Sequence, residues 1–175
     1  MVSITSLAAR PAPGISADRY PSAVGYWIAG VIFLADQASK YVVYEFTPYG
    51  WVQAVTSFFN LVHVWNYGAA FSFLADAGGW QRFFFGGIAL LVSTLLIYML
   101  RKPLAMLERL SYAMLLGGAL GNGLDRGVRG YVVDFLDFHV FGWHWPAFNV
   151  ADIGIVCGAA LLVCASLLQT RPTTP

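Results

Sequence analysis

The stretch ERLSYAMLLGGALGNGLDR (residues 108–126) is a long apolar run that ends at an aspartate, Asp125. A second run, NVADIGIVCGAALLVCASLL (residues 149–168), has an aspartate, Asp152, near its start. If both runs cross a bilayer, they are antiparallel, so the two carboxylates lie at the same side of the membrane. Ionisable residues at that depth are costly and are candidate functional residues. We therefore expect Asp125 and Asp152 to lie close together.

The composition is that of a membrane protein. Of the 175 residues, 58% are hydrophobic and 11% charged, with a mean hydropathy of +0.65, whereas soluble domains carry about 25% charged residues. A net charge of +1 argues against nucleic acid as a partner. Cys157 and Cys164 are separated by about 10 Å of helical rise, beyond disulfide reach. No metal or cofactor motif is present.

Four segments are long and apolar enough to cross roughly 30 Å of hydrocarbon, namely residues 26–44, 82–100, 108–125 and 149–168. They predict a single integral-membrane domain over residues 23–170. Residues 1–22 lack the apolar segment of a signal peptide, and we expect them to form a disordered cytoplasmic tail. Residues 171–175 are expected to form a second cytoplasmic tail.

The distribution of basic residues predicts the orientation. Arg101, Lys102 and Arg109 cluster at the short connection between the second and third spans, whereas residues 45–81 contain no Lys or Arg. Cytoplasmic loops are the ones enriched in Lys and Arg. Both termini are therefore expected in the cytoplasm, with the two aspartates facing the outside, which is the periplasm in a cell with an outer membrane.

The two outward segments are rich in aromatic residues. Residues 57–74, SFFNLVHVWNYGAAFSFL, have the aromatic and β-branched composition of strands, so we expect a small sheet on the membrane surface. The segment at residues 127–147 is expected to form an interfacial loop or helix. Trp143, Trp145 and Phe148 would anchor it at the headgroups, although a generic aromatic belt fits these residues equally well.

Several polar residues interrupt the apolar pattern. Asp36 and Lys40 are four residues apart, so they share a helix face and can form an ion pair. Alternatively, Lys40 or Gln37 could contact the substrate backbone or a lipid headgroup. Asn66 could donate to a substrate carbonyl and Gly68 would leave room for a peptide, although an Asn-x-Gly sequence is more often a turn.

The two aspartates sit in different local environments. A helix C-terminus disfavours the charge of Asp125, whereas a helix N-terminus favours the ionised form of Asp152. Pairing of Asp125 with Arg126, and capping of the fourth span by Asn149, are the purely structural alternatives. One neutral and one ionised carboxyl are what general acid–base chemistry requires.

The remaining polar residues of the second outward segment are less informative. We expect Asp134 to orient Arg126 or Arg129, and Asp137 to be solvated. The histidines offer no obvious third ligand, so no metal site is expected; they are His63, His139 and His144.

Five motifs occur in order: DQxSK, NxGAAF, GNxxDR, VVDF and FNxAD. This set resembles the lipoprotein signal peptidases (signal peptidase II) over residues 26–168. The resemblance implies a multi-pass aspartic endopeptidase of the bacterial inner membrane. Its substrate would be a diacylglyceryl-modified prolipoprotein, cut before the lipidated cysteine. It implies no cofactor, contacts with membrane lipids, and a site formed within one chain, as in a monomer.

The resemblance also implies roles for individual residues. It makes Asp125 and Asp152 the catalytic dyad that activates water, with the assignment of base and acid left open. Residues that line or support the site would be Asp36, Lys40, Asn66, Gly68, Asn122, Arg126, Asp134, Asn149 and Ala151. The alternative is a non-enzymatic proton or cation relay, which would need polar residues at several depths, and the inner halves of the second and fourth spans offer no such path.

Overall fold

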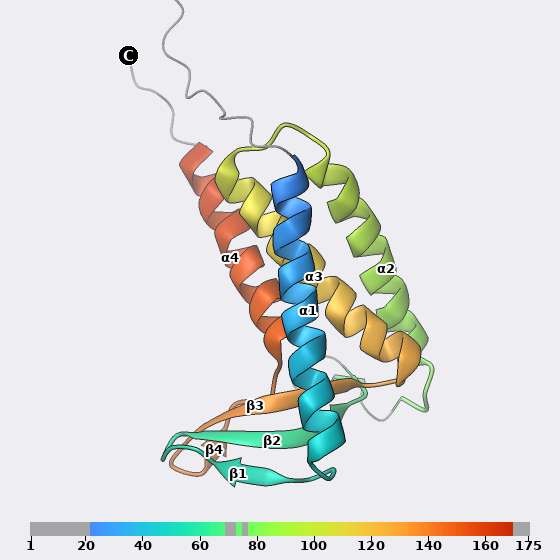
Figure 1. Cartoon of the computed structure of the whole chain (residues 1–175), viewed down its shortest axis with the longest axis vertical. Coiled ribbons are helices and arrows are strands. Elements are labelled where there is room, and N and C mark those ends of the chain that lie inside the picture. The colour runs from blue at the N-terminus through green and yellow to red at the C-terminus, as the bar shows by residue number, and fades with distance from the viewer. Residues whose placement is uncertain (1–21, 69–72, 75–76, 170–175) are drawn as a thin grey trace, which may run out of the picture.

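The computed structural model describes residues 22–68, 73–74 and 77–169. Four helices, α1 (Ser22–Phe46), α2 (Gln81–Leu100), α3 (Met106–Val128) and α4 (Val150–Gln169), form a bundle with a small sheet across one end (Figure 1). Helices α1, α2 and α3 extend the expected segments by one to four residues at an end, and α4 is shifted by one residue from the expected segment. Apart from Ser22, which begins α1, the two expected tails lie outside the described residues.

The bundle is organised around α3, which packs against each of the other three helices. Glycines allow the close approach: a Cβ on Gly117 would lie 2.7 Å from the carbonyl oxygen of Ala29 in α1. A Cβ on Gly118 would lie 2.3 Å from the carbonyl oxygen of Ala151 in α4. Small residues at helix contacts are typical of membrane bundles.

Two of the described helices are long and apolar enough to cross a membrane by length and composition, α2 and residues Val150–Leu168 of α4. Their outer faces are apolar and uncovered, as at Leu90 and Leu91, each 71% exposed. Large exposed apolar surfaces mark contact with a partner or a membrane. By contrast, α1 and α3 carry buried charged residues, Asp36, Lys40 and Asp125 among them.

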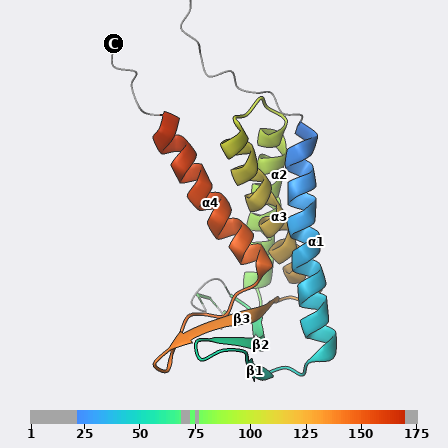
Figure 2. The same cartoon turned by 60° about the vertical axis from the view of Figure 1, so that its left-hand side comes forward.

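The sheet contains β1 (Val52–Ala54), β2 (Phe59–Asn66), β3 (Val132–Val140) and β4 (Trp143–His144), in that spatial order and all antiparallel. The prediction of strands in the first outward segment is confirmed. The sheet crosses the bundle end at a steep angle to the helices, as Figure 2 shows.

The expectation of a loop or helix between the third and fourth spans was wrong, because this segment forms β3 and β4. The sequence VVDFLDFHV places successive side chains on opposite faces of a strand. It pairs with β2 from Asn66 opposite Val132 to Phe59 opposite Phe138. This pairing satisfies a β2 edge that would otherwise be left open.

Candidate functional site

A cavity of about 700 Å³ lies where the sheet meets α3 and α4. Such a volume is typical of small-molecule and peptide pockets. Its polar wall is formed by Asn66 from β2, Asn122 and Arg126 from α3, Asp134 from β3 and Asp152 from α4. Its apolar wall comes from the first turns of α4, from residues 145–148 and, on the sheet side, from Val64, Trp65, Tyr67 and Val132. Five residues that the sequence predicted for the site are therefore brought together.

Asp152 is held by the start of its own helix and by α3. Its backbone N–H donates to Oδ1 of Asn149 (3.0 Å), and the Asn149 N–H donates to Oδ2 of Asp152 (3.2 Å). This reciprocal arrangement confirms the predicted capping by Asn149. The second carboxylate oxygen accepts a hydrogen bond from Nδ2 of Asn122 at 2.7 Å. The carboxylate is thus fixed at the cavity wall.

Asp134 is the second carboxylate of the cavity and is only 2% exposed. Asn149 donates to its Oδ1 at 2.6 Å and Asn66 to its Oδ2 at 3.0 Å. Burial, reinforced by repulsion from Asp152, raises the pKa of Asp134 to about 7, and the two hydrogen bonds oppose this shift only in part. Asn149 therefore contacts both cavity carboxylates. The expected pairing of Asp134 with an arginine is replaced by these two asparagines.

Asp125 is fully buried and does not line this cavity. Its carboxylate pairs with Lys40 at 2.9 Å and with Arg129, and it accepts a weak hydrogen bond from the Val133 N–H at 3.4 Å. Helix α3 continues for three residues past Asp125, so this aspartate faces α1 from within the last turn. The spacing of four residues between Asp125 and Arg129 was the sequence signal for this pair.

Arg126 has a different role from the one considered for it. Its guanidinium donates to the carbonyl oxygens of Gly68 (2.8 Å) and Asn122 (3.3 Å). Its Nε is buried without a partner among the described residues. The Asn66 side chain accepts a hydrogen bond from the Gly68 N–H at 3.0 Å, the turn geometry that was the alternative for this motif. Residues 69–71 of the motif lie outside the described residues.

Lys40 connects Asp125 to the cavity indirectly. Its ammonium group contacts Asp36 (2.8 Å), Asp125 (2.9 Å) and Oδ1 of Asn122 (2.9 Å), and Asn122 in turn donates to Asp152. Lys40 and Asn122 therefore stand between the two aspartates that the sequence paired, and the predicted ion pair of Asp36 with Lys40 is confirmed.

Asp36 also secures the start of α4. Its Oδ1 accepts a hydrogen bond from the backbone N–H of Ala151 at 2.8 Å, and both residues are fully buried. The first N–H groups of a helix have no partner within the helix. Asp36 satisfies one of them next to Asp152, so it helps to position the cavity carboxylate.

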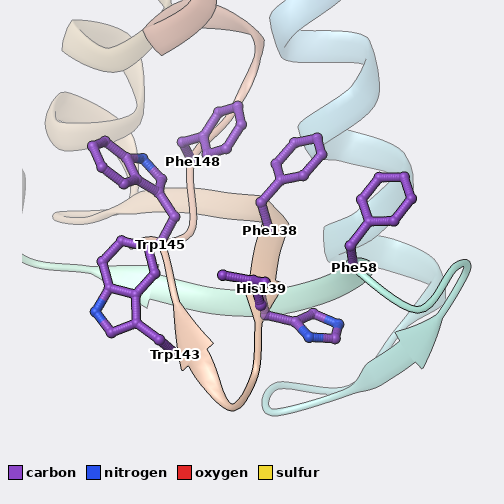
Figure 3. Close-up of a pocket in the computed structure, with 7 residues that line it drawn as sticks. Phe58, Phe138, His139, Trp143, Trp145 and Phe148 are labelled. Carbon is purple, nitrogen blue, oxygen red and sulfur yellow. The ribbon is translucent and has the colours of Figure 1, made fainter.

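The outer part of the sheet carries an aromatic surface around a second cavity of about 430 Å³. Figure 3 shows Phe58, Phe138 and Phe148 beside one another. The ring centroid of Phe138 lies 6.4 Å from that of Phe58 and 5.9 Å from that of Phe148, with interplanar angles of 17° and 13°. Beneath this surface, the prediction that Asp137 is solvated was wrong. Asp137 is 6% exposed and accepts a hydrogen bond from Asn60 at 2.8 Å.

Comparison with known proteins identifies the family. The model of the family described as Signal peptidase (SPase) II matches residues 28–168. A lipoprotein signal peptidase of Serratia marcescens is 52% identical over 147 residues, which cover 84% of this chain and 86% of that protein. The lipoprotein signal peptidase of Cupriavidus taiwanensis is 46% identical, and the match covers 98% of this chain and 99% of that protein.

A solved structure supports the same relationship. A bacterial membrane enzyme determined at 2.3 Å resolution by the in meso method superposes with a TM-score of 0.79 and is 31% identical. The match covers 89% of this chain and 94% of that one. The chain therefore belongs to the signal peptidase II family, membrane proteases that remove signal peptides from prolipoproteins.

Proposed function

We propose that this protein is an aspartic endopeptidase whose catalytic dyad is Asp134 and Asp152. The observation that carries the proposal is the position of Asn149, which donates to Asp134 and caps Asp152 while both carboxylates line one cavity. Two carboxylates in one site cannot both ionise freely, so one keeps a proton. The sequence predicted a different dyad, Asp125 and Asp152, and experiment can distinguish the two.

The chemistry follows from the different environments of the two carboxylates. Asp152, ionised, takes a proton from a water molecule as the water oxygen attacks the scissile carbonyl carbon. Asp134 is neutral below its raised pKa of about 7 and hydrogen-bonds the carbonyl oxygen. Collapse of the tetrahedral intermediate breaks the C–N bond, and the amine leaves with a proton from the dyad. No covalent enzyme intermediate forms.

Asp125 then acts through its neighbours rather than on substrate. It is buried outside the cavity wall, and its charge is balanced by Lys40 and Arg129. Lys40 holds Asn122, and Asn122 orients Asp152. In this proposal Asp125 is a positioning residue that supports Asp152.

The substrate is a diacylglyceryl-modified prolipoprotein cut before its lipidated cysteine. The cavity walls support this choice, because Arg126 and Asn66 offer polar contacts to a peptide beside the carboxylates. On the α4 side, Ile153 and Val156 line the cavity, and their side chains are 41% and 67% exposed. Acyl chains in the bilayer can therefore lie against α4 while the scissile amide lies at Asp152.

We further propose four spans in the inner membrane, with both termini cytoplasmic, the sheet outside, and a monomer as the working unit. The basic α2–α3 connection, which includes Arg101 and Lys102, lies at the end of the bundle opposite the sheet (Figure 1). The positive-inside tendency supports a cytoplasmic location for that end. The aromatic surface around Phe138 would then contact the headgroups of the outer leaflet.

Cleavage by the purified protein in detergent tests the function. Wild type and Asp152→Asn are incubated with a prolipoprotein that carries or lacks the diacylglyceryl group. We expect cleavage of the lipidated form alone, and none by the variant, because both dyad assignments require Asp152. Absence of cleavage by folded wild type would favour the alternative function, a non-enzymatic proton or cation relay. Cleavage by folded Asp152→Asn would exclude an aspartic dyad containing this residue.

A further inference from the structure

His63 is a buried histidine that the proposed chemistry does not use. It lies on β2, is 2% exposed, and has a polar partner at each ring nitrogen. The indole Nε1–H of Trp65 donates to its Nε2 at 3.0 Å. Its Nδ1 lies 3.0 Å from the carbonyl oxygen of Thr47 and 3.2 Å from the Thr47 hydroxyl.

These contacts define the form of the imidazole. An indole N–H can only donate, so Nε2 of His63 must carry a free lone pair. A carbonyl oxygen can only accept, so Nδ1 must carry the proton and donate to Thr47. The hydroxyl of Thr47 donates to the carbonyl oxygen of Val43 at 2.7 Å and so is also available as an acceptor. His63 is therefore held as the neutral Nδ1–H tautomer.

Trp65 is the link between His63 and the cavity, whose wall it helps to form. Its ring centroid lies 4.5 Å from that of Tyr49, and also 4.5 Å from that of Tyr131, on which it stacks with an interplanar angle of 18°. With the N–H directed at His63, the indole offers no free donor to the cavity. The pairing of β2 with β3 is irregular between Leu61 and Val64, next to His63, as is common where a strand re-aims side chains near a site.

We propose that His63 is a positioning residue for substrate binding: it fixes the Trp65 indole as an apolar wall for the prolipoprotein segment in the cavity. This rests on the proposed function of that cavity. Without the acceptor on His63, the indole N–H of the half-buried Trp65 loses its partner, and the indole turns to find another one. The binding-competent population falls, and the apparent affinity falls with it. The dyad is untouched, so the chemical step is preserved.

A double-mutant cycle tests this role. His63→Ala should raise KM roughly five-fold, the effect of losing one buried hydrogen bond, with kcat unchanged. His63→Gln, which is similar in size and offers an acceptor, should restore KM. In a Trp65→Phe background, which lacks the indole N–H, His63→Ala should add nothing. His144→Ala, at a histidine outside the main cavity, is the control: it removes a contact with Asp137 (2.9 Å) but none with Trp65, so KM should stay at the wild-type value.

The hydrogen bond itself can be followed without activity. In NMR spectra of protein labelled with ¹⁵N at tryptophan, the indole N–H resonance that is present in wild type and missing from Trp65→Phe belongs to Trp65. Its hydrogen exchange should accelerate in His63→Ala and not in His144→Ala. Unchanged exchange, or an equal KM increase from His63→Ala in both backgrounds, would overturn the proposal. If wild type cleaves nothing while the exchange result holds, the proposed function fails and the positioning of Trp65 by His63 stands.

Discussion

Replacement of Gly118 by alanine should separate α4 from α3 and disable the site without changing any polar residue. An added Cβ would lie 2.3 Å from the Ala151 carbonyl oxygen and 2.7 Å from Cγ1 of Ile155, and ordinary contact begins at 3.4 Å. The nearest atom is backbone, so no side-chain rotation can relieve the clash. The first turn of α4 must therefore retreat by about 1.1 Å, the difference between 3.4 and 2.3 Å.

That displacement falls directly on the cavity. Ala151 precedes Asp152 and is held by Asp36 through its backbone N–H. A misplacement of about 1 Å in catalytic geometry can cost roughly 100-fold in rate. Overpacking of a tight contact costs about 1–3 kcal/mol of stability. We expect Gly118→Ala to lose about two orders of magnitude in cleavage rate and to unfold at a lower temperature.

The assay compares cleavage rates and thermal unfolding in detergent for Gly118→Ala and Gly127→Ala. Gly127 lies in the same helix, but a Cβ there meets nothing within 4 Å. The control therefore carries the same chemical change without the clash, and it should keep the wild-type rate. Equal rates and unfolding temperatures for the two variants would refute the claim that α3–α4 contact sets the position of Asp152.

Burial raises the pKa of Asp134 from 3.8 to about 7. The folded protein therefore binds this proton more tightly than the unfolded chain, and the resulting contribution to folding stability is fully present below pH 3.8 and lost as the pH rises through about 7. The cleavage rate should fall as the pH rises through about 7. Asp134→Asn should remove this pH dependence of the unfolding temperature, and the same pH dependence in wild type and variant would contradict the raised pKa of Asp134. Lys40→Met leaves buried carboxylates uncompensated and should destabilise the protein by about 3–5 kcal/mol in thermal unfolding, whereas wild-type stability would argue against the network. In a cysteine-free background, Phe141→Cys should react with an impermeant maleimide from outside and Lys102→Cys only from the cytoplasm; the reverse would invert the proposed topology.

Local spacing was enough to predict several contacts of the site. The four-residue interval between Asp36 and Lys40 predicts their ion pair because one helix turn separates them. The position of Asn149 before an apolar run predicts a cap, and the reciprocal bonds with Asp152 are present. The aromatic and β-branched composition of residues 57–74 predicts strand structure, and β2 (Phe59–Asn66) lies in this stretch. Each of these features is determined within a few residues of sequence.

The partner of Asp152 depends on contacts that spacing does not encode. Antiparallel spans place Asp125 near the right depth, but depth alone does not say which way its side chain points. It points toward Lys40 in α1. Asp134 reaches the cavity because β3 pairs with β2 and the sheet covers the start of α4. That arrangement depends on long-range strand register, and the sequence pattern predicts a loop or helix where β3 forms.

The most direct test of the proposed Asp134–Asp152 dyad is cleavage of the lipidated prolipoprotein by Asp134→Asn and by Asp125→Asn. Each variant is compared with wild type, and its folding is checked by thermal unfolding. Asp134 lines the cavity and Asp125 lies behind Lys40, so Asp134→Asn should reduce turnover to background. Asp125→Asn should keep measurable turnover, with its loss arising from weaker positioning of Asp152. A folded Asp125→Asn without activity, beside an active Asp134→Asn, would contradict the account and assign the dyad to Asp125 and Asp152.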